Sequence, residues 1–262
     1  METTHFAGLD LGSSFTKGIL LDEDKQVLAR SVERTGINFS EVGKEILGQM
    51  ARTAGLTPEQ ISVVTTGIGR NNVEGIRFSK PEINCFGKGS YFLFGGPCTV
   101  VDIGGQDNKI IKLDKEGKQV FFRMNRKCAA GTGSFLEEIA LKLNMKTQDM
   151  NEMAQKASEP VAVGSFCTVF AGTEIIHHLR AGENTDGLMR GVYESVTKRI
   201  LEMATLDDQV ILTGGAIANN PVLVDLFREK IPNTIQVPDS PQFVGALGAA
   251  LYAIEDYEEN EG

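Results

Sequence analysis

An internal repeat constrains the fold of this chain more than any other feature of its sequence. The segment 6–22 aligns with the segment 98–114 at a constant offset of 92 residues, with six identities in 17 positions. Each copy has the pattern of an apolar strand, a glycine turn, a second strand, a polar turn and a third strand. Alternation alone would make two hairpins similar, but it does not explain identical Asp, Gly and Lys residues. The repeat therefore predicts two similar units, with Asp10 matching Asp102, Gly12 matching Gly104 and Lys17 matching Lys109.

The rest of the chain alternates strands with helices, which predicts an α/β protein. Further strands are expected at 61–66, 209–213 and 234–237. Spacing and capping residues predict helices at 39–54, 82–93, 132–143, 147–158, 169–179, 186–204, 221–230 and 243–254. The sequence Gly95-Gly96-Pro97 marks a boundary, so we expect an N-terminal lobe at 1–96, a C-terminal lobe at 97–262 and a cleft between them. The last helix is expected to pack back on the N-terminal lobe.

Composition and charge exclude several classes of protein. The chain has 262 residues, a net charge of −9, 41% hydrophobic and 23% charged residues, as globular proteins with a real core do. The negative balance argues against nucleic-acid binding, and the longest uncharged run, 16 residues at 209–224, is too short to span a membrane. Four cysteines without a signal sequence argue against a disulfide framework, so we expect a cytoplasmic protein. Five acids among the last eight residues predict a solvated tail.

Two carboxylates stand at predicted strand ends beside tight glycine turns. Asp10 opens the sequence Asp-Leu-Gly-Ser-Ser, and Asp102 opens Asp-Ile-Gly-Gly-Gln-Asp. Glycine lets backbone N–H groups approach a phosphate, whereas the carboxylates suit Mg²⁺ and the orientation of an attacking water. A third glycine junction, at 212–220, follows a predicted strand and offers bare backbone to the face of a nucleoside. One such turn is weak support for a nucleotide site, but three in this order are strong.

Together these motifs resemble those of the acetate and sugar kinase/Hsp70/actin superfamily. The resemblance implies two RNase H-like lobes, duplicated ββαβ-type units, that bind ATP and Mg²⁺ in the cleft and close around them. Asp10 and Asp102 are expected to hold the metal and water, with Gln106 and Asp107 orienting the water. The expected nucleotide-binding residues are Gly12, Ser13, Ser14, Lys17, Gly104, Gly105, Gly131, Thr132, Gly133, Gly214, Gly215, Ala216 and Asn219.

Two of the four cysteines have the setting of metal ligands. Cys128 and Cys167 each precede a predicted helix, where free N–H groups and the helix dipole favour a thiolate. The cations beside Cys128 strengthen this effect, and they are Arg123, Arg126 and Lys127. By contrast, Cys98 lies in an apolar strand and Cys85 is expected to be inert.

A metal site within one chain lacks ligands. Two thiolates are too few for a buried iron–sulfur cluster, which needs four, and the chain has no CxxC motif. A two-fold dimer resolves the count, because each subunit supplies two. The pair His177-His178 suggests another metal, but adjacent helical residues point about 100° apart, so a surface pair is expected.

At the cysteines the resemblance becomes more specific. The sequences Asn-Arg-Lys-Cys-Ala-Ala-Gly-Thr-Gly-Ser-Phe-Leu-Glu (125–137) and Cys-Thr-Val-Phe-Ala (167–171), with Asp-Ile-Gly-Gly-Gln-Asp (102–107), resemble the activator component (archerase) of 2-hydroxyacyl-CoA dehydratases. That family also contains ATPase subunits of benzoyl-CoA reductase. The resemblance runs end to end and implies a homodimer bridged by one [4Fe–4S] cluster on Cys128 and Cys167 of both chains. Two departures concern the partner: Phe86 stands where family members generally carry His, and Ala171-Gly-Thr-Glu174 replaces the common Ala-Glu-Ser-Glu.

These observations predict an ATP-driven one-electron donor. Reduced ferredoxin or flavodoxin is expected to load the cluster, and ATP·Mg²⁺ to close the lobes, so that the electron passes to a partner iron–sulfur dehydratase or reductase. Two other classes stay open. A small-molecule kinase would use the same cleft with a catalytic base and no cysteine ligands, and an actin-like scaffold would use Cys128 only for packing.

Overall fold

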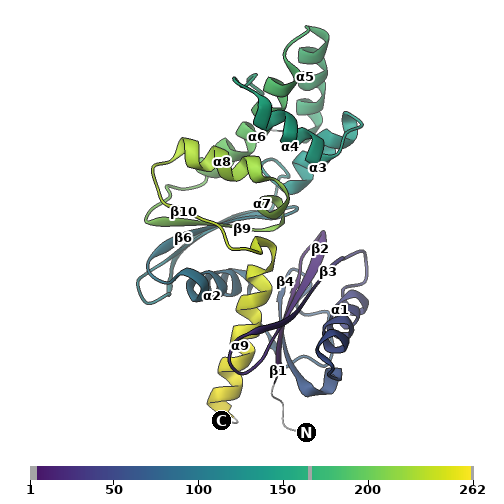
Figure 1. The fold of residues 1–262 in the computed structure, drawn as a ribbon, viewed down its shortest axis with the longest axis vertical. Helices are drawn as coiled ribbons and strands as arrows, with labels where there is room; N and C mark the ends of the chain where they lie inside the picture. Colours follow the sequence, from purple (N-terminus) through teal and green to yellow (C-terminus); the bar gives the residue numbers. More distant parts are fainter. Residues whose placement is uncertain (1–4, 165–166, 261–262) are drawn as a thin grey trace. The chain divides into compact units, whose positions relative to one another are not determined.

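The computed structural model describes residues 5–164 and 167–260. The chain forms two compact units (Figure 1). The first unit comprises Met1–Pro97, Leu113–Val120 and Gln242–Gly262, and the second comprises Cys98–Lys112 and Phe121–Pro241. The chain therefore returns to the first unit at its C-terminal helix.

The described strands form two five-stranded sheets with the same strand order. They are β1 (His5–Leu11), β2 (Phe15–Leu21), β3 (Val27–Arg34), β4 (Ile61–Gly67), β5 (Phe78–Ser79), β6 (Cys98–Ile103), β7 (Asn108–Leu113), β8 (Gln119–Asn125), β9 (Gln209–Thr213) and β10 (Ile235–Gln236). The first sheet has the order β3-β2-β1-β4-β5, and the second has the matching order β8-β7-β6-β9-β10. In both sheets the strand that carries the motif aspartate pairs in parallel with a later strand, β4 or β9. The α/β class and the duplication predicted from the sequence repeat are confirmed.

The helices follow the predicted segments closely. They are α1 (Phe39–Ala54), α2 (Glu82–Phe94), α3 (Gly133–Lys142), α4 (Thr147–Lys156), α5 (Thr168–Arg180), α6 (Thr185–Leu201), α7 (Gly215–Asn219), α8 (Pro221–Lys230) and α9 (Val244–Asn260). Short 3₁₀ turns lie at Pro58–Gln60 and Pro241–Phe243. Cap chemistry fixes α1: Asn38 Oδ1 accepts the backbone N–H of Glu41, and Gly55 ends the helix with a left-handed φ of 71°. None of the described helices is both long and apolar enough to cross a membrane.

In the first unit the sheet lies between α1 and α9 (Figure 1). Side chains of β1 alternate between the two faces, so that Leu9 and Leu11 join the core beneath α1 while Phe6 joins the core beneath α9. Close approach of α9 to the sheet requires glycine, because a Cβ on Gly8 would lie 1.9 Å from the carbonyl oxygen of Ala246. Helix α9 is thus packed directly behind the strand that carries Asp10.

Helix α9 is longer than the sequence predicts and includes most of the acidic tail. Helix α9 continues to Asn260 instead of ending near 254. Asp256 pairs with Arg77 at 2.7 Å, and Glu255 pairs with Lys88. These ion pairs attach the acidic end of the helix to other residues of the first unit, while Glu255, Glu258 and Glu259 are exposed to solvent.

The second unit has one continuous core that includes side chains from β6, β7, β9 and the helices α3–α8. The fully buried Tyr193 on α6 lies near the centre of a polar cluster within this core. Its hydroxyl donates to Asn220 Oδ1 at 2.9 Å and accepts from Asn151 Nδ2 at 2.8 Å. Because Asn220 follows α7, this cluster fixes the third glycine junction from behind.

Candidate nucleotide-binding and thiol sites

The first glycine turn joins β1 to β2. Asp10 is buried one residue before the end of β1 and stands opposite Lys17 on β2, with 3.7 Å between Lys17 Nζ and Asp10 Oδ2. A Cβ on Gly12 would lie 2.8 Å from the carbonyl oxygen of Phe15, so only glycine allows this tight turn. Of the two serines, Ser13 is exposed and Ser14 is half-buried. The turn therefore presents backbone, hydroxyl groups and one ammonium group beside a buried carboxylate.

Gly67 is a residue of this turn's surroundings that the sequence analysis missed. It ends β4 with a φ of 89°, directly beside Leu11 in the parallel pairing. A Cβ on Gly67 would lie 2.5 Å from the carbonyl oxygen of Leu11 and 2.8 Å from Asp10 Oδ1. The signal was present in the sequence, since a Thr-Gly pair stands at the end of the predicted strand 61–66 as it does at the end of the predicted strand 209–213.

The second glycine turn joins β6 to β7 and has a buried ion-pair cluster. Lys109 Nζ lies 2.9 Å from Asp102 Oδ2 and 2.8 Å from Asp107 Oδ1. Burial disfavours the charge on Lys109, but the two carboxylates outweigh burial and hold the pKa of Lys109 above its ordinary value. Thr213 Oγ1 donates to Asp102 Oδ1 at 3.3 Å. Asp102 is thereby oriented from two strands, β7 and β9.

The carboxylate of Asp107 is also engaged by a second cation. Arg126 Nε lies 3.5 Å from Asp107 Oδ2, so each carboxylate oxygen of Asp107 faces a different positive charge. Gln106, by contrast, is exposed. Of the two residues predicted to orient water, Gln106 has an open side chain and Asp107 is held by ion pairs.

The N-terminal end of α3 is hydrogen-bonded to the second glycine turn. The N–H of Gly133 donates to the carbonyl oxygen of Gly104 at 2.9 Å, and the N–H of Ser134 donates to that of Gly105 at 2.8 Å. Asn108 Nδ2 donates to the carbonyl oxygen of Gly131 at 2.9 Å. The predicted segment 131–133, with Thr132 fully buried, therefore lies against the second turn.

The third glycine junction meets the same carboxylate from the other side. Gly214 has a φ of 99° and a ψ of 168°, and a Cβ there would lie 2.4 Å from the carbonyl oxygen of Ile103 and 2.6 Å from Asp102 Oδ1. On the neighbouring Gly215, a Cβ would meet no described atom within 4 Å. Ala216 is buried, and Asn219 Nδ2 donates to the carbonyl oxygen of Gly215 at 2.7 Å. Gly214 stands to Asp102 as Gly67 stands to Asp10.

The four cysteines divide into two classes. Cys85 and Cys98 are fully buried, and burial raises the pKa of Cys85 to about 12 and that of Cys98 to about 11. Cys128 and Cys167 are exposed free thiols. Cys128 Sγ accepts the N–H of Ala130 at 3.4 Å, and Cys167 immediately precedes α5. Among the described residues, no three or more His, Cys, Asp or Glu side chains gather as a metal site.

The two positions that depart from the archerase pattern have defined surroundings. Phe86 is buried in α2, and a Cβ on Gly245 would lie 3.0 Å from its ring and 3.3 Å from Asp10 Oδ2. An apolar ring thus stands close behind the first motif. Glu174 Oε1 accepts the N–H of Gly164 at 2.7 Å and lies 3.8 Å from His178 Nε2. His178 is half-buried and pairs with carboxylates, whereas its neighbour His177 is exposed.

The duplicated sheets and glycine turns place the protein in a structural class. A ROK family glucokinase from Streptomyces griseus, solved in complex with glucose and AMPPNP, matches this chain with a TM-score of 0.55 over 96% of this chain and 99% of that one. At 13% identity this likeness concerns the fold alone. The fold is that of the acetate and sugar kinase/Hsp70/actin class, as the motifs predict.

The chain belongs to the BadF/BadG/BcrA/BcrD ATPase family, whose sequence profile matches residues 7–253. It is 39% identical over 252 residues to the activator of lactoyl-CoA dehydratase from Anaerotignum propionicum, which covers 95% of this chain and 96% of that protein. The activator of the 2-hydroxyisocaproyl-CoA dehydratase from Clostridium difficile, solved with bound ADPNP, matches with a TM-score of 0.89 at 34% identity, over 98% of this chain and 97% of that one. Component A of the (R)-2-hydroxyglutaryl-CoA dehydratase from Acidaminococcus fermentans gives a TM-score of 0.91 at 34% identity, over 97% and 99% of the two chains. The predicted family resemblance is confirmed.

Proposed function

We propose that this ATPase family member is an ATP-hydrolysing electron donor that activates a partner iron–sulfur enzyme of the 2-hydroxyacyl-CoA dehydratase or related reductase type. In this proposal the protein acts as a homodimer and receives electrons from reduced ferredoxin or flavodoxin. Relatives at 34–39% identity that cover nearly the whole chain are activators or components of such dehydratases, which supports the class of partner.

The nucleotide half of the proposal rests on the three glycine elements. A relative with the same fold holds ADPNP, a non-hydrolysable ATP analogue, which supports ATP as the ligand of this chain. Asp10 and Asp102 are the carboxylates that would hold Mg²⁺, because both are buried at strand ends beside turns too tight for a side chain. Lys17 would contact phosphate oxygens. Lys109 instead forms ion pairs with Asp102 and Asp107 and so fixes the position of Asp102.

The thiol half of the proposal rests on Cys128 and Cys167. Both are exposed and free, so in kind they fit as thiolate ligands of a [4Fe–4S] cluster. Cys167 is the N-cap of α5, whereas Cys128 lies in the segment between β8 and α3. One chain supplies two of the four ligands, and a second copy would supply the others. When bound, such a cluster stores and passes one electron. Burial removes Cys85 and Cys98 from the ligand set.

One observation carries the proposal: the second glycine turn and the segment after Cys128 are parts of one hydrogen-bonded unit. Gly104 and Gly105 accept hydrogen bonds from Gly133 and Ser134. Coupling of a nucleotide to a metal centre needs a physical connection of this kind between the two sites. The start of the helix that follows Cys128 is therefore hydrogen-bonded directly to the glycine turn.

Anaerobic purification tests the proposal. We expect a brown protein with about four irons and four sulfides per dimer. The colour, iron and sulfide should be lost in Cys128→Ser and in Cys167→Ser. Cys98→Ala is the matched control, because Cys98 is buried. This substitution should leave the iron content unchanged. Binding of ADPNP should persist in all three variants. Full iron and sulfide in both serine variants would contradict the ligand assignment, and a colourless protein whose ATP turnover needs an added hydroxyl acceptor would indicate a kinase.

A further inference from the structure

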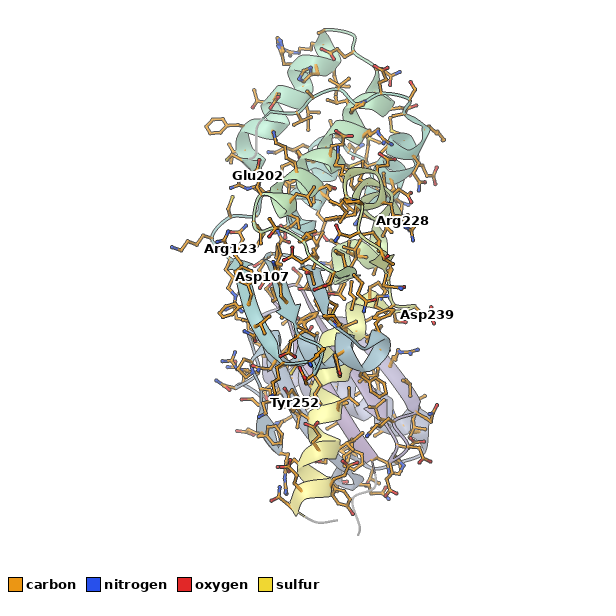
Figure 2. The ribbon with its side chains drawn as sticks, turned by 90° about the vertical axis from the view of Figure 1, so that its left-hand side faces the viewer. Asp107, Arg123, Glu202, Arg228, Asp239 and Tyr252 are labelled. Atoms are coloured by element: carbon orange, nitrogen blue, oxygen red, sulfur yellow. The ribbon has the colours of Figure 1, made fainter. Side chains whose placement is uncertain are left out.

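Arg126 connects the second glycine turn with the Cys128 segment by charge. It follows β8 and precedes Cys128 by two residues, and its Nε lies 3.5 Å from Asp107 Oδ2. The other oxygen of Asp107 is held by Lys109 at 2.8 Å, and Lys109 also holds Asp102 at 2.9 Å. A chain of alternating charges therefore runs from the motif carboxylate Asp102 to the residues beside Cys128. Figure 2 labels Asp107, which belongs to the turn between β6 and β7.

The two ends of this charge chain differ in burial. The side chains of Asp102 and Lys109 are 3% and 4% exposed, so their pair is shielded from water and strong. The side chains of Asp107 and Arg126 are 23% and 45% exposed, and their pair is longer. Partly exposed pairs are held by little free energy. The Asp107–Arg126 pair is therefore the element that a new charge nearby can make or break.

The other links between the turn and this segment do not respond to charge in the same way. The hydrogen bonds from Gly133 to Gly104 and from Asn108 to Gly131 join neutral groups within the unit. They hold the start of α3 against the turn through groups that carry no net charge. A nucleotide with Mg²⁺ would bring phosphate charges and a cation close to Asp102. Both would change the local charge with which Lys109 and Asp107 interact.

We propose that Arg126 is a positioning residue through which nucleotide bound at the second glycine turn sets the conformation of the Cys128 segment. Release or capture of Arg126 by Asp107 is the two-state event, and the nucleotide biases it because its charges interact differently with the two states. The inference deepens the proposed function and rests on it for the role of Cys128 as a ligand. It assigns no contact between Arg126 and the nucleotide or the metal centre.

The reactivity of the Cys128 thiol tests this coupling without a cluster. Full-length, iron-free protein carrying Cys167→Ser has Cys128 as its one exposed cysteine, since Cys85 and Cys98 are buried. We measure the rate of labelling by N-ethylmaleimide, a neutral reagent, with and without ADPNP·Mg²⁺. The nucleotide is expected to change this rate about three- to fivefold, because a partly exposed ion pair is worth up to about 1 kcal/mol, a factor of about five.

Adding Arg126→Gln to this protein should reduce the effect of the nucleotide on the labelling rate to less than about twofold. The affinity for ADPNP should stay within about threefold of that of the parent protein. Arg126→Lys should restore part of the effect. The readout is the ratio of the labelling rates with and without nucleotide. The effect of losing a positive charge beside the thiol is the same in both rates and therefore cancels. Arg123→Gln is the matched control (Figure 2): Arg123 lies on β8, stacks on Phe121 at 6.0 Å and donates to the carbonyl oxygen of Met203, outside the charge chain.

The inference would be overturned by a full nucleotide effect in Arg126→Gln, or by an equal loss in Arg126→Gln and Arg123→Gln. An absent nucleotide effect in the Cys167→Ser protein that still binds ADPNP would overturn it as well. Failure of the proposed function shows elsewhere, in the iron and sulfide content of the cysteine variants. The two failures are therefore distinguishable.

Discussion

Replacing Gly214 by alanine tests whether the third glycine junction must lie as close to Asp102 as the structure shows. Gly214 has a φ of 99° and a ψ of 168°, a region of backbone space that is essentially restricted to glycine. Forcing alanine into such a conformation costs about 1–3 kcal/mol. The new Cβ would also lie 2.4 Å from the carbonyl oxygen of Ile103 and 2.6 Å from Asp102 Oδ1.

The clash adds to the backbone strain because its partners cannot yield easily. Ile103 belongs to β6, which pairs with β9, and Asp102 is held by Lys109 and Thr213. Overpacking of this kind costs about 1–3 kcal/mol. We therefore expect Gly214→Ala to lower the free energy of unfolding by about 2–6 kcal/mol in all.

Urea denaturation followed by circular dichroism measures this loss, with Gly182→Ala as the control. Gly182 also has a positive φ, 77°, but a Cβ there would meet no described atom within 4 Å. Its substitution should cost only the backbone strain of about 1–2 kcal/mol. ADPNP affinity should fall in Gly214→Ala alone, because the Cβ displaces Asp102. Equal stability of the two variants, with ADPNP affinity unchanged, would refute the reasoning.

Two further predictions follow from burial and charge. In iron-free native protein at pH 8, a thiol reagent should modify two cysteines rapidly and all four after denaturation, because burial raises the pKa of Cys85 to about 12 and of Cys98 to about 11 and both side chains are inaccessible. Four rapid thiols in the native protein would contradict this division. Lys109→Met should lower the free energy of unfolding by about 3–5 kcal/mol, since it leaves buried Asp102 uncompensated. Lys17→Met should lower the free energy of unfolding less, because Lys17 is more exposed and lies 3.7 Å from Asp10. A smaller loss of stability in Lys109→Met than in Lys17→Met would show that the buried cluster does not stabilise the second unit.

The sequence by itself determined the features that arise from neighbouring residues. The repeat, the strand–glycine–strand turns and most helix bounds follow from local periodicity, capping and turn chemistry, so they could be predicted. The division of the cysteines also follows from local setting, since Cys98 lies in an apolar strand and Cys128 lies among cations.

Only the tertiary structure decided which distant residues meet. A Cβ on Gly67 would lie 2.8 Å from Asp10 Oδ1 and one on Gly214 would lie 2.6 Å from Asp102 Oδ1, because parallel pairing of separated strands sets their register. The pairing of Arg126 with Asp107 likewise depends on how β8 ends beside the turn between β6 and β7. Distances of 2–4 Å between groups far apart along the chain depend on sheet register and core packing, which no local pattern encodes.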